Sequence, residues 1–272
     1  MRTFINYILI IILSITILVF FFANLFSTTI LNEEYLLAKL EEQNYYEKVY
    51  DEIELNFENY IYQSGLEKDV FKDIITKEKI KNDIKIIINN IYSNNKQEID
   101  TSEIESNLQK NIDNYLEKSG ISDFQSESIN LFISQICKEY KTAISVINIQ
   151  LNINQINTYI NLIKRTCLIA ICISIILLLA LDFKFLKKAN VGVGLSMLIS
   201  GMVLIFIRFY VTSKINIGLI TFLNDATTII IRSITNEILN LIMTFGITMF
   251  LAGILLIIIF NYIKINQGKR SK

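Results

Sequence analysis

Carboxylates, tyrosines and cysteines are candidate chemical groups in this sequence, which contains no histidine. Without imidazole there is no Ser-His or Cys-His couple and no histidine-ligated metal site. The carboxylates suit calcium binding or acid-base catalysis, but no Asp-x-Asp-x-Asp-Gly loop is present and most acids lie beside lysines on polar helix faces. We therefore expect solvated helix surfaces, with no catalytic residue, no metal and no cofactor.

The three cysteines form no recognisable ligand set. Cys137 is the only cysteine between residues 32 and 160, so no disulfide is expected within that segment. Cys167 and Cys172 lie within an apolar stretch, separated by four residues, where packing is the expected role because no further ligands are nearby. No phosphate loop or nucleophile elbow is present either, so a non-enzymatic protein is predicted.

Two features inside the apolar stretches suggest specific contacts. Arg208 lies near one end of such a stretch, where it is expected to snorkel to headgroups, pair with Asp225 or touch anionic lipid. Small residues repeat at helical spacing and predict close helix packing, either within the chain or between two copies; they are Gly192, Ser196 and Ser200 in one stretch and Gly246 and Gly253 in another.

The elements that must position these residues are membrane spans. The chain is 52% hydrophobic with a mean hydropathy of +0.42, too apolar for an ordinary soluble protein of 272 residues. Crossing a hydrocarbon core takes about 20 helical residues. Four stretches qualify, and they cover residues 4–26, 166–183, 189–210 and 238–263. The first resembles a signal peptide in part, but its apolar run is long and lacks a small-x-small cleavage site, which favours an uncleaved anchor.

Charge is divided unevenly along the chain. Residues 32–160 carry 13 Lys and 23 Asp or Glu, whereas the remainder is basic. Seven basic residues mark the loop between the second and third stretches and the C-terminal tail, so the positive-inside rule places both in the cytoplasm. The predicted topology has four spans, both termini cytoplasmic and residues 32–160 extracytoplasmic. Lys164 and Arg165 oppose this trend, but they lie at a helix end from which they can snorkel.

The acidic segment is predicted to be a helical bundle. Apolar residues recur at spacings of three and four, and a core is expected from Ile53, Phe57, Ile84, Ile88, Leu108, Ile112 and Ile136. Two helices are expected to end at Ser64-Gly65 and Ser119-Gly120, in segments that align at an offset of 55 and indicate either a duplication or a shared stop signal. A short helix is expected over 66–75, and overlapping capping boxes from Asp100 to Glu105 predict the start of another.

Two segments allow more than one interpretation. Residues 147–154 alternate strictly between apolar and polar, which is typical of a strand, but they also suit a helix continuing into the second span. Residues 215–237 are amphipathic and predict an interfacial helix or an outward extension of the fourth span. The predicted fold is therefore all-α, with a membrane anchor over 1–31, an extracytoplasmic helical bundle over 32–160 and a three-helix membrane domain over 161–272.

The order of anchor, outer domain and three clustered spans resembles the topology of FtsX and MacB-like permease subunits of ABC systems, although the loop at 184–190 is too short for their coupling element. The segments Leu31-Asn32-Glu33-Glu34-Tyr35 and Ile99-Asp100-Thr101-Ser102-Glu103-Ile104 resemble helical-ectodomain membrane proteins of Gram-positive bacteria, a group that implies no activity. We expect the lipid bilayer and a protein or envelope component as partners, and no nucleic acid. A transport or mechanotransmission subunit of an ABC-type complex is the alternative.

Overall fold

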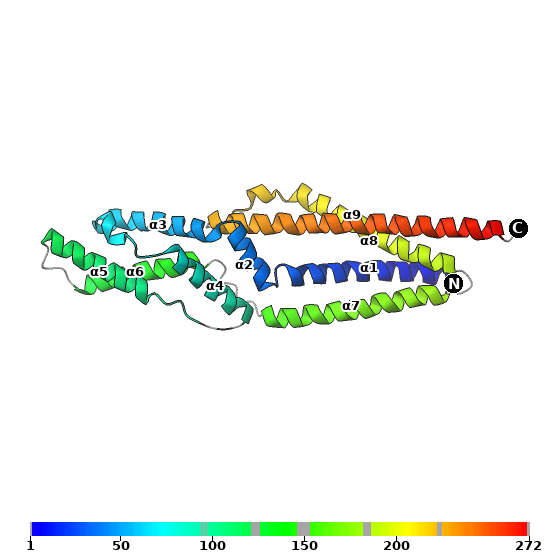
Figure 1. The fold of residues 1–272 in the computed structure, drawn as a ribbon, viewed down its shortest axis with the longest axis horizontal. Coiled ribbons are helices and arrows are strands. Elements are labelled where there is room, and N and C mark those ends of the chain that lie inside the picture. Colours follow the sequence, from blue (N-terminus) through cyan, green and yellow to red (C-terminus); the bar gives the residue numbers. More distant parts are fainter. Residues whose placement is uncertain are drawn as a thin grey trace. The chain divides into compact units, whose positions relative to one another are not determined.

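The computed structural model describes residues 2–93, 95, 97–120, 126–145, 153–181, 186–221 and 225–270, and these residues are helical with short connections and no strand (Figure 1). The chain divides into two compact units. Unit 1 contains Met1–Asn32, Gln155–Ile220 and Ile231–Lys272, and unit 2 contains Glu33–Asn154 with Thr221–Ile230. The first segment of unit 2 ends at residue 154, while the predicted domain boundary at residue 160 stays a prediction.

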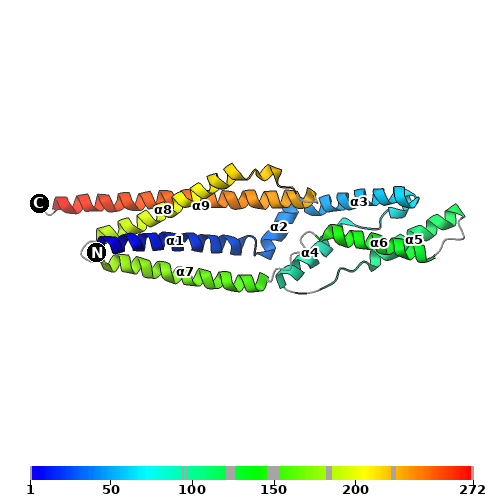
Figure 2. The ribbon, with the colours of Figure 1, turned by 180° about the vertical axis from the view of Figure 1, so that it is seen from behind.

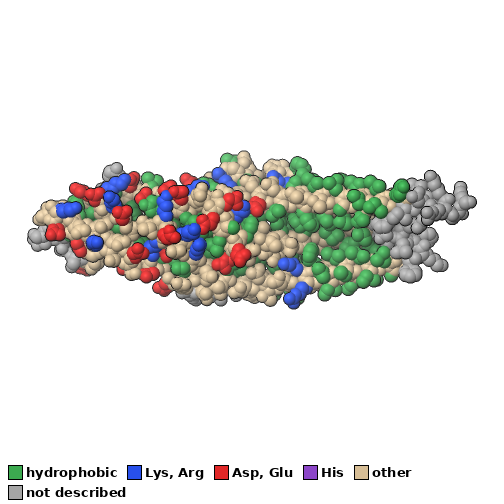
Figure 3. Space-filling view, in the orientation of Figure 1, with side chains coloured by type: hydrophobic (Ala, Val, Ile, Leu, Met, Phe, Trp, Pro, Cys, Tyr) green, Lys and Arg blue, Asp and Glu red, His purple; other side chains and the backbone are tan. Residues whose placement is uncertain are grey.

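Unit 1 is built from four long apolar helices, which confirms the predicted membrane spans. They are α1 (Arg2–Thr28), α7 (Ile153–Leu181), α8 (Leu186–Lys214) and α9 (Asp225–Arg270). Candidate spans cover Phe4–Thr28, Ile153–Ala180, Val191–Lys214 and Asp225–Ile259. Figures 1 and 2 show these helices running alongside one another, and Figure 3 shows a broad hydrophobic surface over them. The protein is therefore a multi-pass membrane protein by length and composition of its helices.

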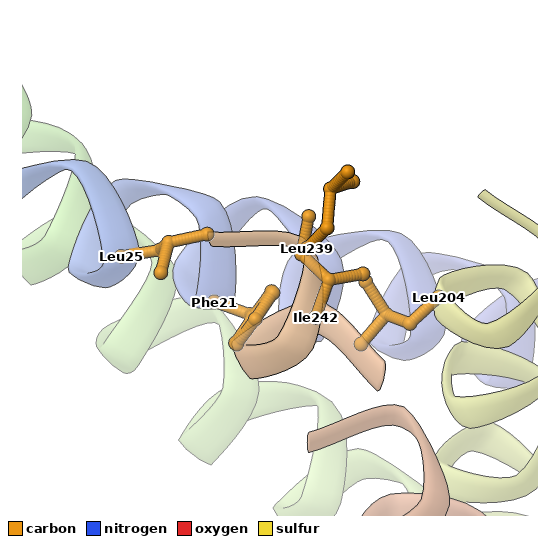
Figure 4. Packing of buried hydrophobic residues seen from close by; sticks show 5 residues of the cluster. All are labelled: Phe21, Leu25, Leu204, Leu239 and Ile242. Atoms are coloured by element: carbon orange, nitrogen blue, oxygen red, sulfur yellow. The ribbon is translucent and has the colours of Figure 1, made fainter. Parts of the chain in front are cut away.

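Two apolar clusters hold unit 1 together. The first joins Leu13 of α1 to Leu178 of α7, with Leu9 and Ile10 beside them. The second brings together side chains of α1, α8 and α9, shown in Figure 4; they are Phe21, Leu25, Leu204, Leu239 and Ile242. The ring of Phe21 also stacks on that of Phe245, with centroids 4.3 Å apart and an interplanar angle of 17°. Each cluster lies at a different level of α1, so this helix contacts different partners along its length.

The helix α9 is unusually long for a membrane span. It contains 46 residues without interruption. At about 1.5 Å per residue it extends about 70 Å, more than twice the thickness of a hydrocarbon core of about 30 Å. Residues 225–237 are thus the first turns of this helix rather than a separate helix, while Ile217–Leu219 forms a 3-10 turn, η2. The amphipathic segment 215–237 is therefore divided between a short turn and an extended fourth span.

Unit 2 is a bundle of shorter helices. These are α2 (Glu33–Glu42), α3 (Tyr45–Ser64), the 3-10 turn η1 (Lys68–Phe71), α4 (Lys77–Ser93), α5 (Ser102–Ser119) and α6 (Ser126–Ile144). All seven residues predicted to form the core are buried, with at most 6% of their surface exposed. The periodicity of apolar residues therefore identified the buried face of these helices correctly.

The predicted stops of α3 and α5 are also confirmed. Gly65 and Gly120 follow these helices with φ angles of 71° and 65°, the left-handed conformation that glycine adopts without steric cost. Ser64 and Ser119 are the last helical residues in the two cases. Both helices therefore end at a Ser-Gly pair in which the glycine is left-handed.

The expected helix over 66–75 is wrong, because only η1 forms there. Asp73 has a φ angle of 58°, which interrupts a right-handed helix. The carbonyl oxygens of Val70 and Lys72 instead accept hydrogen bonds from the side-chain amide of Asn111 at 3.1 and 2.9 Å. A distant side chain therefore satisfies backbone groups that helical bonds would otherwise use. Residues 147–152, for which strand and helix were both open, lie outside the described residues, and α7 begins at Ile153.

Candidate functional site

A groove in unit 2 runs between α5 and α6, which lie side by side in Figures 1 and 2. It has a volume of about 790 Å³ and opens to the surface. Both helices contribute polar side chains to it. The lining consists of Thr101, Ser102, Glu105, Ser106 and Gln109 from the α5 side and of Asn130, Ile133, Ser134, Cys137, Lys138 and Lys141 from α6.

One end of this groove is fixed by the way α5 begins. The backbone N–H of Ser102 donates to Oδ1 of Asp100 at 2.9 Å, and the same bond lowers the pKa of the Asp100 carboxyl. Thr101 occupies the N-cap position, but its hydroxyl donates to Oε1 of Glu105 at 2.9 Å. The helix thus begins where the capping boxes predicted, but the two expected pairs, Asp100 with Glu103 and Ser102 with Glu105, are wrong. Thr101 holds Glu105, and Asp100 accepts the first free backbone N–H of the helix.

Cys137 lies at the floor of the groove. Its side chain is buried, and this burial raises the pKa of the thiol, with the neighbouring Glu105 acting in the same direction. A thiol with a raised pKa is protonated at neutral pH and is a poor nucleophile. Cys137 therefore behaves as a small apolar floor residue beside Ile133, which is also buried.

A buried polar cluster anchors the same two helices to α4. The hydroxyl of Tyr140 donates to Oδ2 of Asp83 at 2.6 Å, and the ammonium of Lys79 lies 3.2 Å from the same oxygen. Lys79 also donates to the backbone carbonyl of Asp100 at 2.8 Å. Burial and the bond to Asp83 both raise the pKa of Tyr140, so its hydroxyl stays a donor. This cluster ties α4, α6 and the start of α5 together and makes the groove a fixed feature of unit 2.

The lining of this groove is polar and charged. Hydroxyl and amide groups offer both donors and acceptors, while Glu105 and the two lysines at 138 and 141 add charges of both signs. Among the described residues, no group of three or more Cys, Asp or Glu side chains is placed to hold a metal ion. No sequence signal indicated this groove, because the residues of α5 and α6 that share it are separated by more than 20 positions.

The small residues predicted to pack helices lie on one face of α8 against α1. The hydroxyl of Ser196 donates to the carbonyl of Ile10 at 3.1 Å, and that of Ser200 donates to the carbonyl of Ser14 at 3.1 Å. Ser14 returns a bond to the carbonyl of Ser196 at 3.2 Å. A methyl group added at Gly192 would lie 3.5 Å from the side chain of Ile10, so this end of the row is less crowded.

A second face of α8 meets α9 through glycines. A methyl group at Gly201 would lie 2.7 Å from the carbonyl oxygen of Gly246, and one at Gly253 would lie 2.7 Å from that of Gly194. Such distances require that backbone meets backbone with no side chain between. The glycines of α9 predicted to pack helices therefore contact α8 within the chain, and α8 carries two separate small-residue faces.

The predicted pair of Arg208 and Asp225 joins residues of different units. Arg208 is half-buried on α8, and Asp225 is exposed at the first position of α9. Their pairing stays a prediction. Arg232 makes a contact that the sequence did not indicate. Its Nε donates a hydrogen bond to the carbonyl of Ile220 at 2.8 Å, which joins α9 to the end of η2.

Comparison with known proteins adds no relative. No protein-family model, no curated protein and no solved structure matches the chain.

Proposed function

We propose that this chain is a non-enzymatic integral membrane protein whose outer helical domain binds a protein or envelope partner. In this proposal residues 32–160 are extracytoplasmic and both termini are cytoplasmic, as the positive-inside bias favours. The observation that carries the binding role is the polar groove between α5 and α6. Its floor is rigid, since Cys137 and Ile133 are buried and the cluster around Asp83 holds the helices together.

Site-specific photocrosslinking in intact cells tests the binding role. Ser134 lines the groove, whereas Ser128 lies on the same helix outside it, and both are exposed. A photoreactive phenylalanine derivative at position 134 should give a defined adduct that the same probe at position 128 does not give. Digestion of the adduct with protease or with a wall-degrading hydrolase distinguishes a protein partner from a glycan.

The groove charges supply the matched control. Lys138→Gln removes a charge from the lining, and Lys110→Gln removes one from the exposed face of α5 outside it. The adduct at position 134 should weaken with the first substitution and persist with the second. Equal adducts at positions 128 and 134, or no adduct at either, would contradict binding at this groove.

The sidedness has its own test. A cysteine at Lys96 should react with a membrane-impermeant maleimide on intact cells, while one at Lys187 should react only after permeabilisation. The native cysteines are replaced by serine or alanine first, because Cys172 is exposed. The opposite labelling pattern would overturn the topology and, with it, the extracytoplasmic location of the groove.

One observation favours the alternative, a mechanotransmission subunit of an ABC-type complex. The helix α9 has its first residues in unit 2 and the rest in unit 1, without a break. Within unit 2 the backbone N–H of Ala226 at the start of α9 donates to Oε1 of Glu52 on α3 at 3.1 Å. A continuous helix of this kind transmits a displacement along its axis. Co-purification of an ATPase with the tagged full-length protein would favour this alternative over simple partner binding.

A further inference from the structure

Five basic side chains gather at one end of unit 1. They are Lys164 and Arg165 on α7, Arg208 and Lys214 on α8, and Arg232 on α9, and together they are called the basic belt. The ammonium of Lys164 lies 3.2 Å from the hydroxyl oxygen of Ser27, one residue before the end of α1. This contact places the α7 part of the belt at the end of unit 1 where α1 ends.

The other members lie at the same end because of how α8 packs. Ser200 of α8 contacts Ser14 of α1, and both helices run in the same direction, since Ser196 contacts Ile10. Lys214 and Thr28 each follow that contact by fourteen residues, so they lie at one level. Arg208 lies six residues earlier, about 9 Å deeper at about 1.5 Å per residue. The long arginine side chain can span that depth to the headgroups.

The end of α9 that carries Arg232 lies at the same level as Lys214. This helix runs opposite to α8, because Gly201 faces Gly246 while the earlier Gly194 faces Gly253. Its bond from Arg232 to Ile220 then lies just beyond the end of α8 at Lys214. Three helices therefore bring cations to one level, and Figure 3 shows Lys and Arg side chains at the border of the hydrophobic surface.

Acidic residues do not balance this charge within unit 1. Its sequence has two acids, of which Glu237 lies on α9 near the belt and Asp182 lies outside the described residues. Within unit 1, five cations thus accompany one carboxylate, a surplus of four positive charges between the level of Arg208 and that of Lys214. The candidate span Phe4–Thr28 has 25 residues and is therefore about 37 Å long. The basic belt lies at the Thr28 end of this span, which corresponds to the headgroup region when the span crosses a bilayer.

We propose that the basic belt binds the phosphate groups of anionic phospholipids and gives this end of the protein a preference for them over neutral lipids. Arg165 and Lys214 are exposed beside large apolar side chains that lie deeper in the membrane and face the acyl chains, namely Leu168 and Tyr210, which are 54% and 55% exposed. Each pair is three or four residues apart and shares a helix face. A lipid can therefore place its chains on the apolar residue and its phosphate on the cation. This inference depends on membrane embedding and is independent of the groove in unit 2.

Fluorescence quenching by brominated lipids tests the proposal at single sites, because the chain contains no tryptophan. Leu168→Trp reports on lipid beside Arg165, and Tyr210→Trp reports on lipid beside Lys214. The full-length protein is reconstituted in vesicles of phosphatidylcholine with brominated phosphatidylglycerol or brominated phosphatidylcholine. Brominated phosphatidylglycerol should quench each reporter at a several-fold lower lipid fraction.

Removing one cation should remove most of this local preference. A basic residue near an anionic surface contributes about fivefold to relative affinity. Arg165→Gln should lower the preference that the Leu168→Trp reporter measures by about fivefold, whereas Arg165→Lys should retain it. Lys214→Gln should act likewise on the Tyr210→Trp reporter. A Tyr262→Trp reporter on the distant part of α9 should not respond to either substitution, and Lys110→Gln in unit 2 should change none of the reporters.

Three results would overturn the proposal. Equal quenching by the two brominated lipids would show that the belt has no lipid preference. A preference that survives both Gln substitutions would assign it to other residues. Loss of the preference when inorganic phosphate replaces chloride at constant ionic strength would show that the belt binds free phosphate instead of lipid.

Discussion

The glycine contact between α8 and α9 gives the sharpest test of the membrane unit. A methyl group at Gly201 would lie 2.6 Å from the backbone nitrogen of Phe250 and 2.7 Å from the carbonyl oxygen of Gly246. Both obstacles are backbone atoms, so no side chain can rotate away. Carbon atoms in ordinary contact lie about 3.5 Å or more apart, so Gly201→Ala requires α8 and α9 to separate by about 1 Å.

The expected cost follows from that separation. A gap of about 1 Å forfeits a quarter to a half of each dispersion contact, and overpacking of this kind costs about 1–3 kcal/mol. Alanine recovers up to about 1 kcal/mol through its higher helix propensity. Gly201→Ala should therefore lower the free energy of unfolding by about 1–2 kcal/mol. Gly192 is the matched control, because its added methyl group would lie 3.5 Å from the side chains of Ile10 and Leu178.

The measurement is reversible unfolding of the full-length protein from mild detergent into sodium dodecyl sulfate, followed by circular dichroism. Gly192→Ala should be neutral or stabilising by up to about 1 kcal/mol. A Gly201→Ala variant as stable as Gly192→Ala would refute the backbone contact between α8 and α9. An equal loss of unfolding free energy in both variants would contradict the difference in packing between Gly192 and Gly201.

Further predictions concern unit 2 in the full-length protein. Phe57→Ala should cost about 3–5 kcal/mol, because the ring is 5% exposed and packs on Phe71; a loss below about 1 kcal/mol by denaturant titration would contradict a core position. Tyr140→Phe should cost about 1–3 kcal/mol, because it removes the hydrogen bond to buried Asp83, whereas Tyr60→Phe, outside this cluster, should be silent. Burial raises the pKa of Tyr46 and of Tyr92 to about 12, so the folded state favours their neutral hydroxyls. Their contribution to the free energy of unfolding should be fully present below about pH 10 and should be lost as the pH rises above it. An unfolding temperature that is unchanged between pH 9 and pH 11 would contradict this. Glu52→Ala should speed hydrogen exchange at the first turn of α9 while Asp51→Ala should not, because Glu52 accepts the Ala226 N–H.

The sequence by itself determined the local features. Four apolar stretches predicted four membrane helices, and spacings of three and four identified buried residues such as Ile53, Leu108 and Ile136. The stops at Gly65 and Gly120 were also readable, because a left-handed residue after a helix favours glycine wherever that helix packs. These features depend on residues close in the chain, so a single sequence is enough to predict them.

Only the tertiary structure decided which surfaces meet. Ser196, Ser200 and Gly192 of α8 lie against α1, whereas Gly194 and Gly201 of the same helix contact α9, although all five are small residues of one span. The groove between α5 and α6 and the bond from Asn111 that replaces a helix near Val70 likewise join distant residues. Residues 225–230, at the start of α9, cluster with unit 2, which is far from them in the sequence. Periodicity reveals that a helix has a face to bury, but the partner of that face is set by the packing of the whole unit.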